Sequence, residues 1–254
     1  MTDDNQRDAP DQRDLASGGG KRPWYSISLF FVFILPFIFL FKTILKNVQR
    51  KPFFWSIGLI CVLGWAWSMI LSYTTWWVFP KDFILGIYVL PYVPLEEFLI
   101  YPLGGAFSIF VYTFSSRRLP RKCNAAVYWS FISLVTLLFV VLAVVKRDSH
   151  PYYLYSQFAL YNALCFLLAP LVAKDVNLPG LFVSVFALGS VGFVWDYFAF
   201  KFGWWVYNAI TQVKVIGIPV EDFNFYSLAT VSAIVLYVLF CRRFAVSQFP
   251  AKTE

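Results

Sequence analysis

The sequence predicts an all-α integral membrane protein of about seven transmembrane helices, built as two parallel three-helix repeats joined by a connecting helix. Three observations carry this prediction. Hydrophobic residues make up 59% of the chain and charged residues only 14%, whereas about a quarter of a soluble domain is charged. Apolar runs longer than about 18 residues, enough to cross a bilayer, recur from Trp24 to Cys241. Two parts of the chain also match each other at a constant offset.

The first 23 residues are rich in Asp, Arg, Gln and Gly and contain no apolar run. They predict a disordered polar tail and not a signal peptide. The apolar runs then predict transmembrane spans at 25–45, 53–72, 83–114, 125–145, 154–173, 179–200 and 215–241. A short polar tail is expected at 244–254.

The third and seventh spans are longer than one crossing needs, and prolines interrupt both. Pro91 and Pro94 stand in the third and Pro219 in the seventh. Because proline fits the first turn of a helix, we expect a short approach segment and then a helix that begins at the proline. Irregular backbone at membrane depth is tolerated only where protein buries it or a cavity adjoins it, so the two breaks point to a site.

The repeat is visible residue by residue. The series Trp67, Trp76, Trp77 and Val78 matches Trp195, Trp204, Trp205 and Val206 at an offset of 128. After a three-residue difference in length, Pro94, Glu96, Glu97 and Phe98 match Pro219, Glu221, Asp222 and Phe223. We therefore predict a first repeat at 24–122, a connecting helix within 123–150 and a second repeat at 151–243. Since four spans separate equivalent helices, both acidic pairs should lie at the same face of the membrane.

The net charge of +7 does not indicate nucleic-acid binding, because the basic residues cluster in short stretches between apolar runs, as at 117–122. Twelve Lys and Arg fall on the side of the 46–51 and 117–122 loops and nine on the other. The positive-inside rule then places the C-terminus in the cytoplasm and the acidic pairs toward the opposite face. The four cysteines lack CxxC spacing and His150 is the only histidine, so neither a metal nor a cofactor site is predicted.

The acidic residues fall into two groups. Asp82, Asp148 and Asp175 each follow a basic residue in a predicted loop. The others have no adjacent base and lie in or at the edge of apolar spans: Glu96, Glu97, Asp196, Glu221 and Asp222. Ionisable groups at such depth usually mark functional paths. The alternative is that the paired acids only cap helix N-termini at the interface, and their occurrence twice at matching places favours a functional role.

These acids suit acid–base chemistry. A helix N-terminus favours the carboxylate, whereas desolvation and a second acid favour the protonated form. One acid can then donate a proton while another accepts one, and we expect the two pairs to share one composite site. Aromatic residues near the acids would stabilise a cation, although plain packing is the alternative for each. The candidate substrate-binding residues are Trp76, Trp77, Phe98, Trp195, Trp204, Trp205 and Phe223.

Three stretches resemble a known family. VPLEEF at 93–98, IPVEDF at 218–223 and WDYFAFKFGWWVYN at 195–208 are similar to the membrane-embedded lycopene cyclases of the heterodimeric type. In that family two short three-span polypeptides, sometimes fused, each carry a Pro-x-Glu-Glu motif. The resemblance implies a fused form that isomerises the linear ends of lycopene to β-ionone rings without a redox cofactor. It makes Glu96, Glu97, Glu221 and Asp222 the acid/base set, with Asp196 as a further polar partner.

The chain departs from this pattern at two positions. Ser68 stands where an aspartate matching Asp196 is expected, and Asp222 shortens one acid by a methylene. The fold is also akin to that of UbiA-type prenyltransferases, but their magnesium-binding NDxxD motifs are not seen. Two other functions stay open: a carotenoid enzyme that quenches the same cation with water, and a non-catalytic protein that binds an isoprenoid or conducts protons. The expected partners are an apolar carotenoid and the lipid bilayer, with a homo-oligomer or other enzymes of carotenoid synthesis left open.

Overall fold

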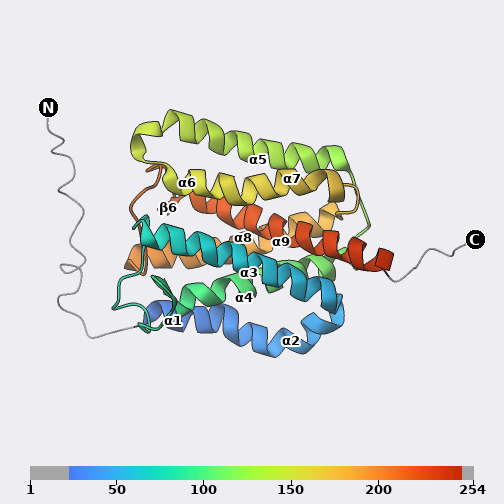
Figure 1. Cartoon of the computed structure of the whole chain (residues 1–254), viewed down its shortest axis with the longest axis horizontal. Helices are drawn as coiled ribbons and strands as arrows, with labels where there is room; N and C mark the ends of the chain where they lie inside the picture. The colour runs from blue at the N-terminus through green and yellow to red at the C-terminus, as the bar shows by residue number, and fades with distance from the viewer. Residues whose placement is uncertain (1–22, 248–254) are drawn as a thin grey trace, which may run out of the picture.

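The computed structural model describes residues 23–247 and contains seven helical spans long and apolar enough to cross a membrane, which confirms the predicted fold class. The spans are Trp24–Asn47, Arg50–Tyr73, Leu95–Ser116, Ala125–Val145, Tyr152–Val172, Leu178–Phe202 and Val220–Ala245. Figure 1 shows them as a bundle of roughly parallel helices. Residues 1–22 and 248–254 of the predicted tails lie outside the described residues. Residues 244–247 continue the last helix, which corrects the predicted start of the C-terminal tail.

Two spans contain a π-helical turn at equivalent places. The first runs through α1 (Trp24–Leu29), η3 (Phe30–Ile34) and α2 (Leu35–Asn47), and the fifth through α6 (Tyr152–Gln157), η5 (Phe158–Asn162) and α7 (Ala163–Val172). The two π turns are 128 residues apart. The other spans are α3 (Arg50–Tyr73), α4 (Leu95–Ser116), α5 (Ala125–Val145), α8 (Leu178–Phe202) and α9 (Val220–Ser247), and a short 3₁₀ helix, η4 (Arg147–Ser149), follows α5.

The segments predicted as the beginnings of the long third and seventh spans are β-hairpins, and this corrects those two boundaries. Strands β2 (Tyr88–Leu90) and β3 (Val93–Pro94) precede α4, and β5 (Lys214–Val215) and β6 (Ile218–Pro219) precede α9. Each helix begins directly after its proline, within one residue of the prediction. The turn residues explain the hairpins.

In the first hairpin Pro91 is followed by Tyr92 with φ +66°, the pattern of a type II turn. In the second, Ile216 and Gly217 both have positive φ, as a two-residue type I′ turn requires. In both cases the hairpin delivers the chain to the start of the helix that carries the acidic pair.

Both acidic pairs lie at the same end of the bundle, as predicted. In Figure 1 the N-termini of α4 and α9 and the hairpins stand at the left end. A third antiparallel ribbon there joins the repeats, because β1 (Trp77–Val78) pairs with β4 (Val206–Tyr207). Val78 pairs with Val206, its own counterpart at offset 128. An approximate two-fold axis therefore passes between these two residues.

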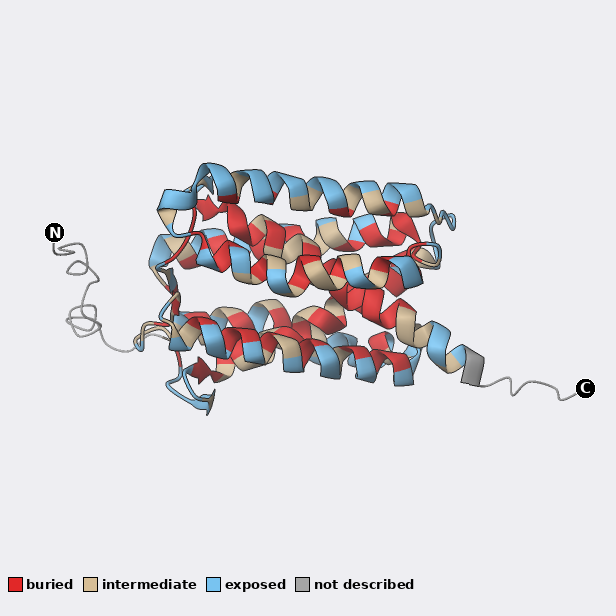
Figure 2. Ribbon diagram, turned by 45° about the horizontal axis from the view of Figure 1, so that its top comes forward, coloured by how far each residue is buried: buried red, intermediate tan, exposed pale blue. Residues whose placement is uncertain are grey.

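The interior of the bundle is formed mainly by α4 and α9, the most buried of the spans. Figure 2 shows buried residues concentrated along the inner helices and α5 largely exposed at the upper edge. Large apolar side chains on the outer faces are exposed, among them Phe39, Leu134, Leu167 and Phe186. Such a surface suits contact with lipid tails. It explains why α5 can be strongly apolar although most of its residues are exposed and not packed in the core.

Candidate functional site

The acids of the first repeat form a hydrogen-bonded cluster around Glu97. Its two carboxylate oxygens accept hydrogen bonds from Ser68 Oγ at 2.9 Å and from Tyr25 OH at 3.2 Å. Tyr101 OH lies 2.5 Å from Ser68 Oγ. Glu97 and Ser68 are at most 1% exposed. A single carboxyl group is thus held among three hydroxyl groups from α1, α3 and α4.

The acids of the second repeat form an equivalent cluster with one more carboxyl group. Asp222 corresponds to Glu97, and Tyr153 OH donates to it at 3.4 Å. Asp196 corresponds to Ser68 and accepts a hydrogen bond from Tyr226 OH at 2.9 Å. Tyr226 stands one turn after Asp222 on the same helix, so the two carboxyl groups belong to one cluster, in which they influence each other electrostatically. Both residues are 1% exposed. Where the first cluster has the hydroxyl group of Ser68, the second therefore has a second carboxyl group, that of Asp196.

Tyr207 adds a phenol to the second cluster from outside the spans. Its hydroxyl lies 3.3 Å from that of Tyr153, within hydrogen-bond distance. Burial, and then the nearby carboxyl group of Asp222, raise the pKa of Tyr207 well above its usual range. The phenol therefore stays protonated and available as a hydrogen-bond donor beside the carboxyl pair.

The other acid of each pair accepts a backbone hydrogen bond from the segment that precedes the hairpin, and so holds that segment against the helix. Glu96 accepts hydrogen bonds from the backbone N–H of Leu85, at 2.8 Å, and from Ser26 Oγ. Glu221 accepts one from the backbone N–H of Thr211. One oxygen in each of Glu96, Glu221, Asp196 and Asp222 has no hydrogen-bond partner among the described residues. Glu96 and Glu221 thus combine a structural contact with a free buried oxygen atom.

Each cluster is completed by tryptophans from the other repeat. Trp195 and Trp205 pack on Tyr25, with ring centroids 5.6 and 5.0 Å away, while Trp67 stacks on Tyr153 at 5.6 Å. Two hydrogen bonds between the repeats hold these tryptophans in place. Trp67 Nε1 donates to Ser156 Oγ at 2.9 Å, and Trp195 Nε1 donates to Ser28 Oγ at 2.8 Å.

The hydrogen bonds therefore gather the acids into two clusters, one per repeat, and the single composite site expected from the sequence stays a prediction. The expectation that both halves contribute does hold within each cluster, through the exchanged tryptophans. The two clusters differ in chemistry, since only the second contains two carboxyl groups, those of Asp196 and Asp222.

The predicted substrate-binding aromatics divide into two groups. Trp77, Trp195 and Trp205 lie against the tyrosines of the clusters. The others have their ring contacts with different aromatic residues: Trp76 stacks on Tyr152, Phe98 on Trp65, Trp204 on Phe202, and Phe223 packs against Phe193. A substrate-binding role for this second group stays a prediction.

Sequence reasoning missed the tyrosines that contact the acids. Tyr25 and Tyr153 are equivalent at the offset of 128, and Tyr101 and Tyr226 at 125. Extending the repeat match outward from the tryptophans would have found both pairs. Gly64 and Gly192 support the same arrangement, because a Cβ at either would collide with the ring of Tyr101 or Tyr226, respectively. These two glycines let α3 and α8 approach the phenols.

Among residues 23–247 no group of three or more His, Cys, Asp or Glu is placed to hold a metal ion. Comparison of the chain with protein-family models, curated proteins and solved structures found no match. The site is therefore interpreted from its own chemistry.

Proposed function

We propose that this protein is a carotenoid end-group cyclase that isomerises the linear ends of lycopene to β-ionone rings inside the membrane. The observation that carries the proposal is that Asp196 and Asp222 lie in one buried cluster, in which Tyr226 donates a hydrogen bond to Asp196 and Tyr153 donates one to Asp222. The resemblance of the two acidic motifs to the heterodimeric lycopene cyclases supports it from the sequence.

The acid pair supplies the proton balance that cyclisation needs. Two carboxyl groups side by side favour sharing one proton, because two adjacent negative charges repel each other. The protonated member transfers its proton to the terminal double bond and leaves a tertiary cation. A double bond farther along the chain attacks that cation and closes the ring. A carboxylate then removes a proton from the ring, so the product is an isomer of the substrate and no electrons are gained or lost.

The surroundings suit a cationic intermediate. Trp67 stacks on both Tyr153 and Phe225, each with ring centroids 5.6 Å apart. Ring faces attract cations, and the attraction is stronger where water is excluded. The acids are at most 1% exposed, so water is kept from a cation that it would otherwise convert to an alcohol. The exposed apolar flanks of the bundle offer a lipid-soluble substrate an approach from the bilayer.

The two clusters receive different roles in this proposal. The second, with two carboxyl groups, carries the proton transfers through Asp196 and Asp222. In the first, Glu97 is held by hydroxyl groups and has no second carboxyl group in its cluster, which suits a group that positions the substrate. Glu96 and Glu221 hold the segments that precede their helices and present one free oxygen each to the interior.

The test is expression of the chain in cells that accumulate lycopene, followed by chromatographic analysis of the pigments. β-Carotene or γ-carotene is the expected product. A hydroxylated acyclic product would indicate quenching of the cation by water. Unchanged lycopene, with the protein shown to be present in the membrane, would contradict both enzymatic functions.

A non-catalytic isoprenoid-binding protein is the second candidate, and Ser68 favours it. Ser68 removes a carboxyl group from the first cluster but keeps a hydrogen bond to Glu97, so the cluster remains packed without an acid pair. Lycopene that copurifies with the protein and is never converted would support this candidate.

A further inference from the structure

The end of the bundle opposite the acids contains a second feature on the approximate two-fold axis. A hollow of about 680 Å³ lies between the C-terminal ends of α4 and α9. Its walls include Tyr112, Ser116 and Arg117 from α4 and Tyr237, Cys241 and Arg242 from α9. Each of the first three is the repeat counterpart of one of the second three, at an offset of 125. The pocket is therefore assembled symmetrically from both repeats.

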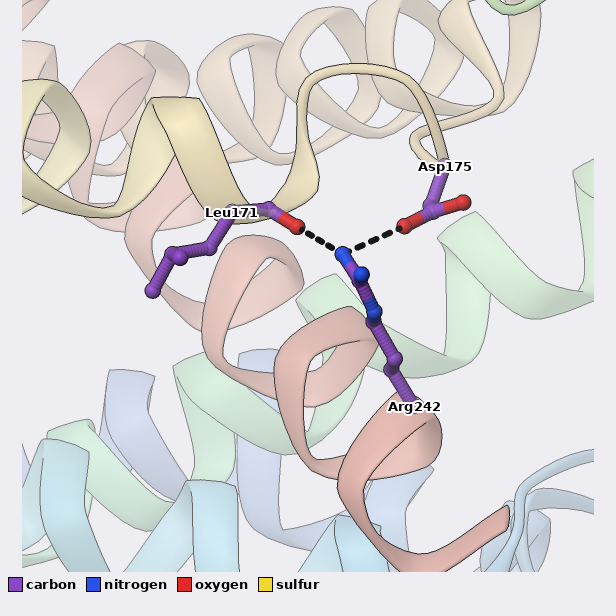
Figure 3. Close-up of polar contacts among 3 residues, drawn as sticks. All are labelled: Leu171, Asp175 and Arg242. Carbon is purple, nitrogen blue, oxygen red and sulfur yellow. Dashed lines mark hydrogen bonds and ion pairs between the residues drawn. The ribbon is translucent and has the colours of Figure 1, made fainter. Parts of the chain in front are cut away.

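Two arginines, one per repeat, line this pocket in unequal electrostatic settings. Arg117 Nη1 donates to the neutral side chain of Asn47 at 3.1 Å. Arg242 Nη1 donates to the carbonyl oxygen of Leu171 at 2.8 Å and lies 3.6 Å from a carboxylate oxygen of Asp175, as Figure 3 shows. Asn47 and Asp175 are themselves counterparts at offset 128. Arg117 has no carboxylate partner in the described chain and keeps its charge available.

Buried hydrogen bonds hold the pocket walls in place. Gln49 donates its backbone N–H to Tyr237 OH at 2.9 Å, and Asn177 donates its own to Tyr112 OH at 3.0 Å. These equivalent bonds tie the start of α3 to α9 and the start of α8 to α4. The pocket is thus formed by fixed helix ends, with hydroxyl and amide groups beside the guanidinium groups.

The charge around the pocket is strongly positive. Asp175 is the one acidic residue at this end of the described chain. The basic residues there are Lys42, Lys46, Arg50, Lys51, Arg117, Arg118, Arg121, Lys122, Lys174, Arg242 and Arg243. Helix ends lie at the depth of lipid headgroups, and basic pockets between helices at that depth suit anionic headgroups. Guanidinium groups bind phosphate oxygens through two parallel hydrogen bonds.

From these observations we propose that the pocket between α4 and α9 binds a phosphate group at the membrane surface, held by Arg117 and Arg242. An anionic lipid headgroup is one source of that group and a soluble phosphate is the other. The site lies at the opposite end of the bundle from the acidic clusters, so the proposal does not depend on the proposed cyclase activity.

The experiment uses the full chain purified in a neutral detergent. Thermal unfolding is followed while dioleoylphosphatidylglycerol, dioleoylphosphatidylcholine or inorganic phosphate is added at constant ionic strength. Bound ligand raises the unfolding temperature in proportion to its occupancy. The test variant is Arg117→Gln with Arg242→Gln. The matched control is Arg118→Gln with Arg243→Gln, which removes the same charge from the adjacent exposed counterparts.

Phosphatidylglycerol is expected to stabilise the wild-type chain, and the test variant should need at least about tenfold more lipid for half of the effect. The control should stay within about twofold of the wild type. If inorganic phosphate gives the stabilisation instead and the test variant loses it, the source of the phosphate group is soluble. Equal losses in the test and control variants, or a wild type that neither phosphatidylglycerol nor inorganic phosphate stabilises, would overturn the proposal.

A single substitution guards against a folding defect. Arg117→Gln leaves the contacts of Arg242 with Leu171 and Asp175 intact, so the wall of the pocket is retained. This variant should show a weaker response to the ligand at an unchanged unfolding temperature without ligand. A wild-type response from Arg117→Gln would contradict the assignment.

Discussion

Val78 pairs in an antiparallel ribbon with Val206, the residue that occupies the same position in the other repeat. A residue that faces its own counterpart marks an axis of approximate two-fold symmetry. The helices follow the same symmetry, because a tryptophan of each repeat packs against a tyrosine of the other repeat. The halves are interlocked and do not fold as two adjacent bundles.

Interlocking predicts that the two halves depend on each other. If the chain is divided between Leu119 and Pro120, in the connection between α4 and α5, each fragment alone should fail to accumulate as a stable membrane protein. The cause is the loss of the ribbon and of the Trp67–Ser156 and Trp195–Ser28 hydrogen bonds. Coexpressed fragments with a tag on one should copurify. Stable fragments that do not associate would show that the exchange is dispensable.

The close approach of glycine to phenol gives a second prediction. Gly64→Ala and Gly192→Ala should each destabilise the protein by about 1 to 3 kcal/mol, because the new methyl group meets the ring of Tyr101 or Tyr226. Gly58→Ala is the control on the same helix as Gly64, since nothing lies within 4 Å of a Cβ there. Thermal unfolding in detergent measures the difference. Equal changes in stability at Gly58 and Gly64 would mean that helix propensity, and not the contact with the phenol ring, determines the effect of the substitution.

The unequal clusters predict unequal effects of removing acids. Asp196→Asn and Asp222→Asn should each reduce ring formation by at least about 100-fold, the usual contribution of a general acid or base. Glu97→Gln should reduce it less, because its cluster contains no second carboxyl group. The exposed Asp148 provides the control, and Asp148→Asn should form rings at the wild-type rate. Pigment analysis normalised to membrane protein measures all four, and a larger loss at Glu97 than at Asp222 would reverse the assignment.

The hydrogen bond between Glu221 and the backbone of Thr211 allows the chemical role of the Glu221 carboxyl group to be tested separately from its structural role. Glu221→Gln keeps a carbonyl oxygen that can accept the backbone N–H of Thr211 but removes the ionisable group. Turnover should fall by less than in Asp222→Asn while the amount of protein in the membrane and its unfolding temperature stay unchanged, and Glu96→Gln should behave alike. A fall in unfolding temperature that parallels the loss of turnover would assign Glu221 a structural role alone.

Much of this architecture could be predicted because the two repeats share distinctive motifs. The Trp-Trp-Val series and the proline–acid motifs located equivalent helices and placed the acidic pairs at one end. The departure at Ser68 also predicted that the two halves differ. Ser68 donates a hydrogen bond to Glu97 in the first cluster, whereas the second cluster has a carboxyl group, that of Asp196, at the equivalent position.

Other features, such as the hairpins and the partners of the acids, depend on contacts between distant parts of the chain, which the local sequence pattern does not show. The short hairpins before α4 and α9 are apolar segments continuous with the helices, so hydropathy merges them with the spans. The phenol partners come from helices far away in the chain, as with Tyr25 and Glu97, 72 positions apart. The exchange of tryptophans between repeats could not be seen in a sequence match, because equivalent residues do not reveal which half they contact.

The most direct measurement of the central claim is isotope incorporation during turnover. Purified protein in liposomes is supplied with lycopene in heavy water, and the products are separated and weighed by mass spectrometry. Protonation by a carboxyl group that exchanges with solvent should add one deuterium atom to each ring formed, while the proton lost afterwards is a hydrogen of the substrate. The account predicts a cyclic product one mass unit heavier per ring. A cyclic product without deuterium, or lycopene recovered unchanged, would contradict it.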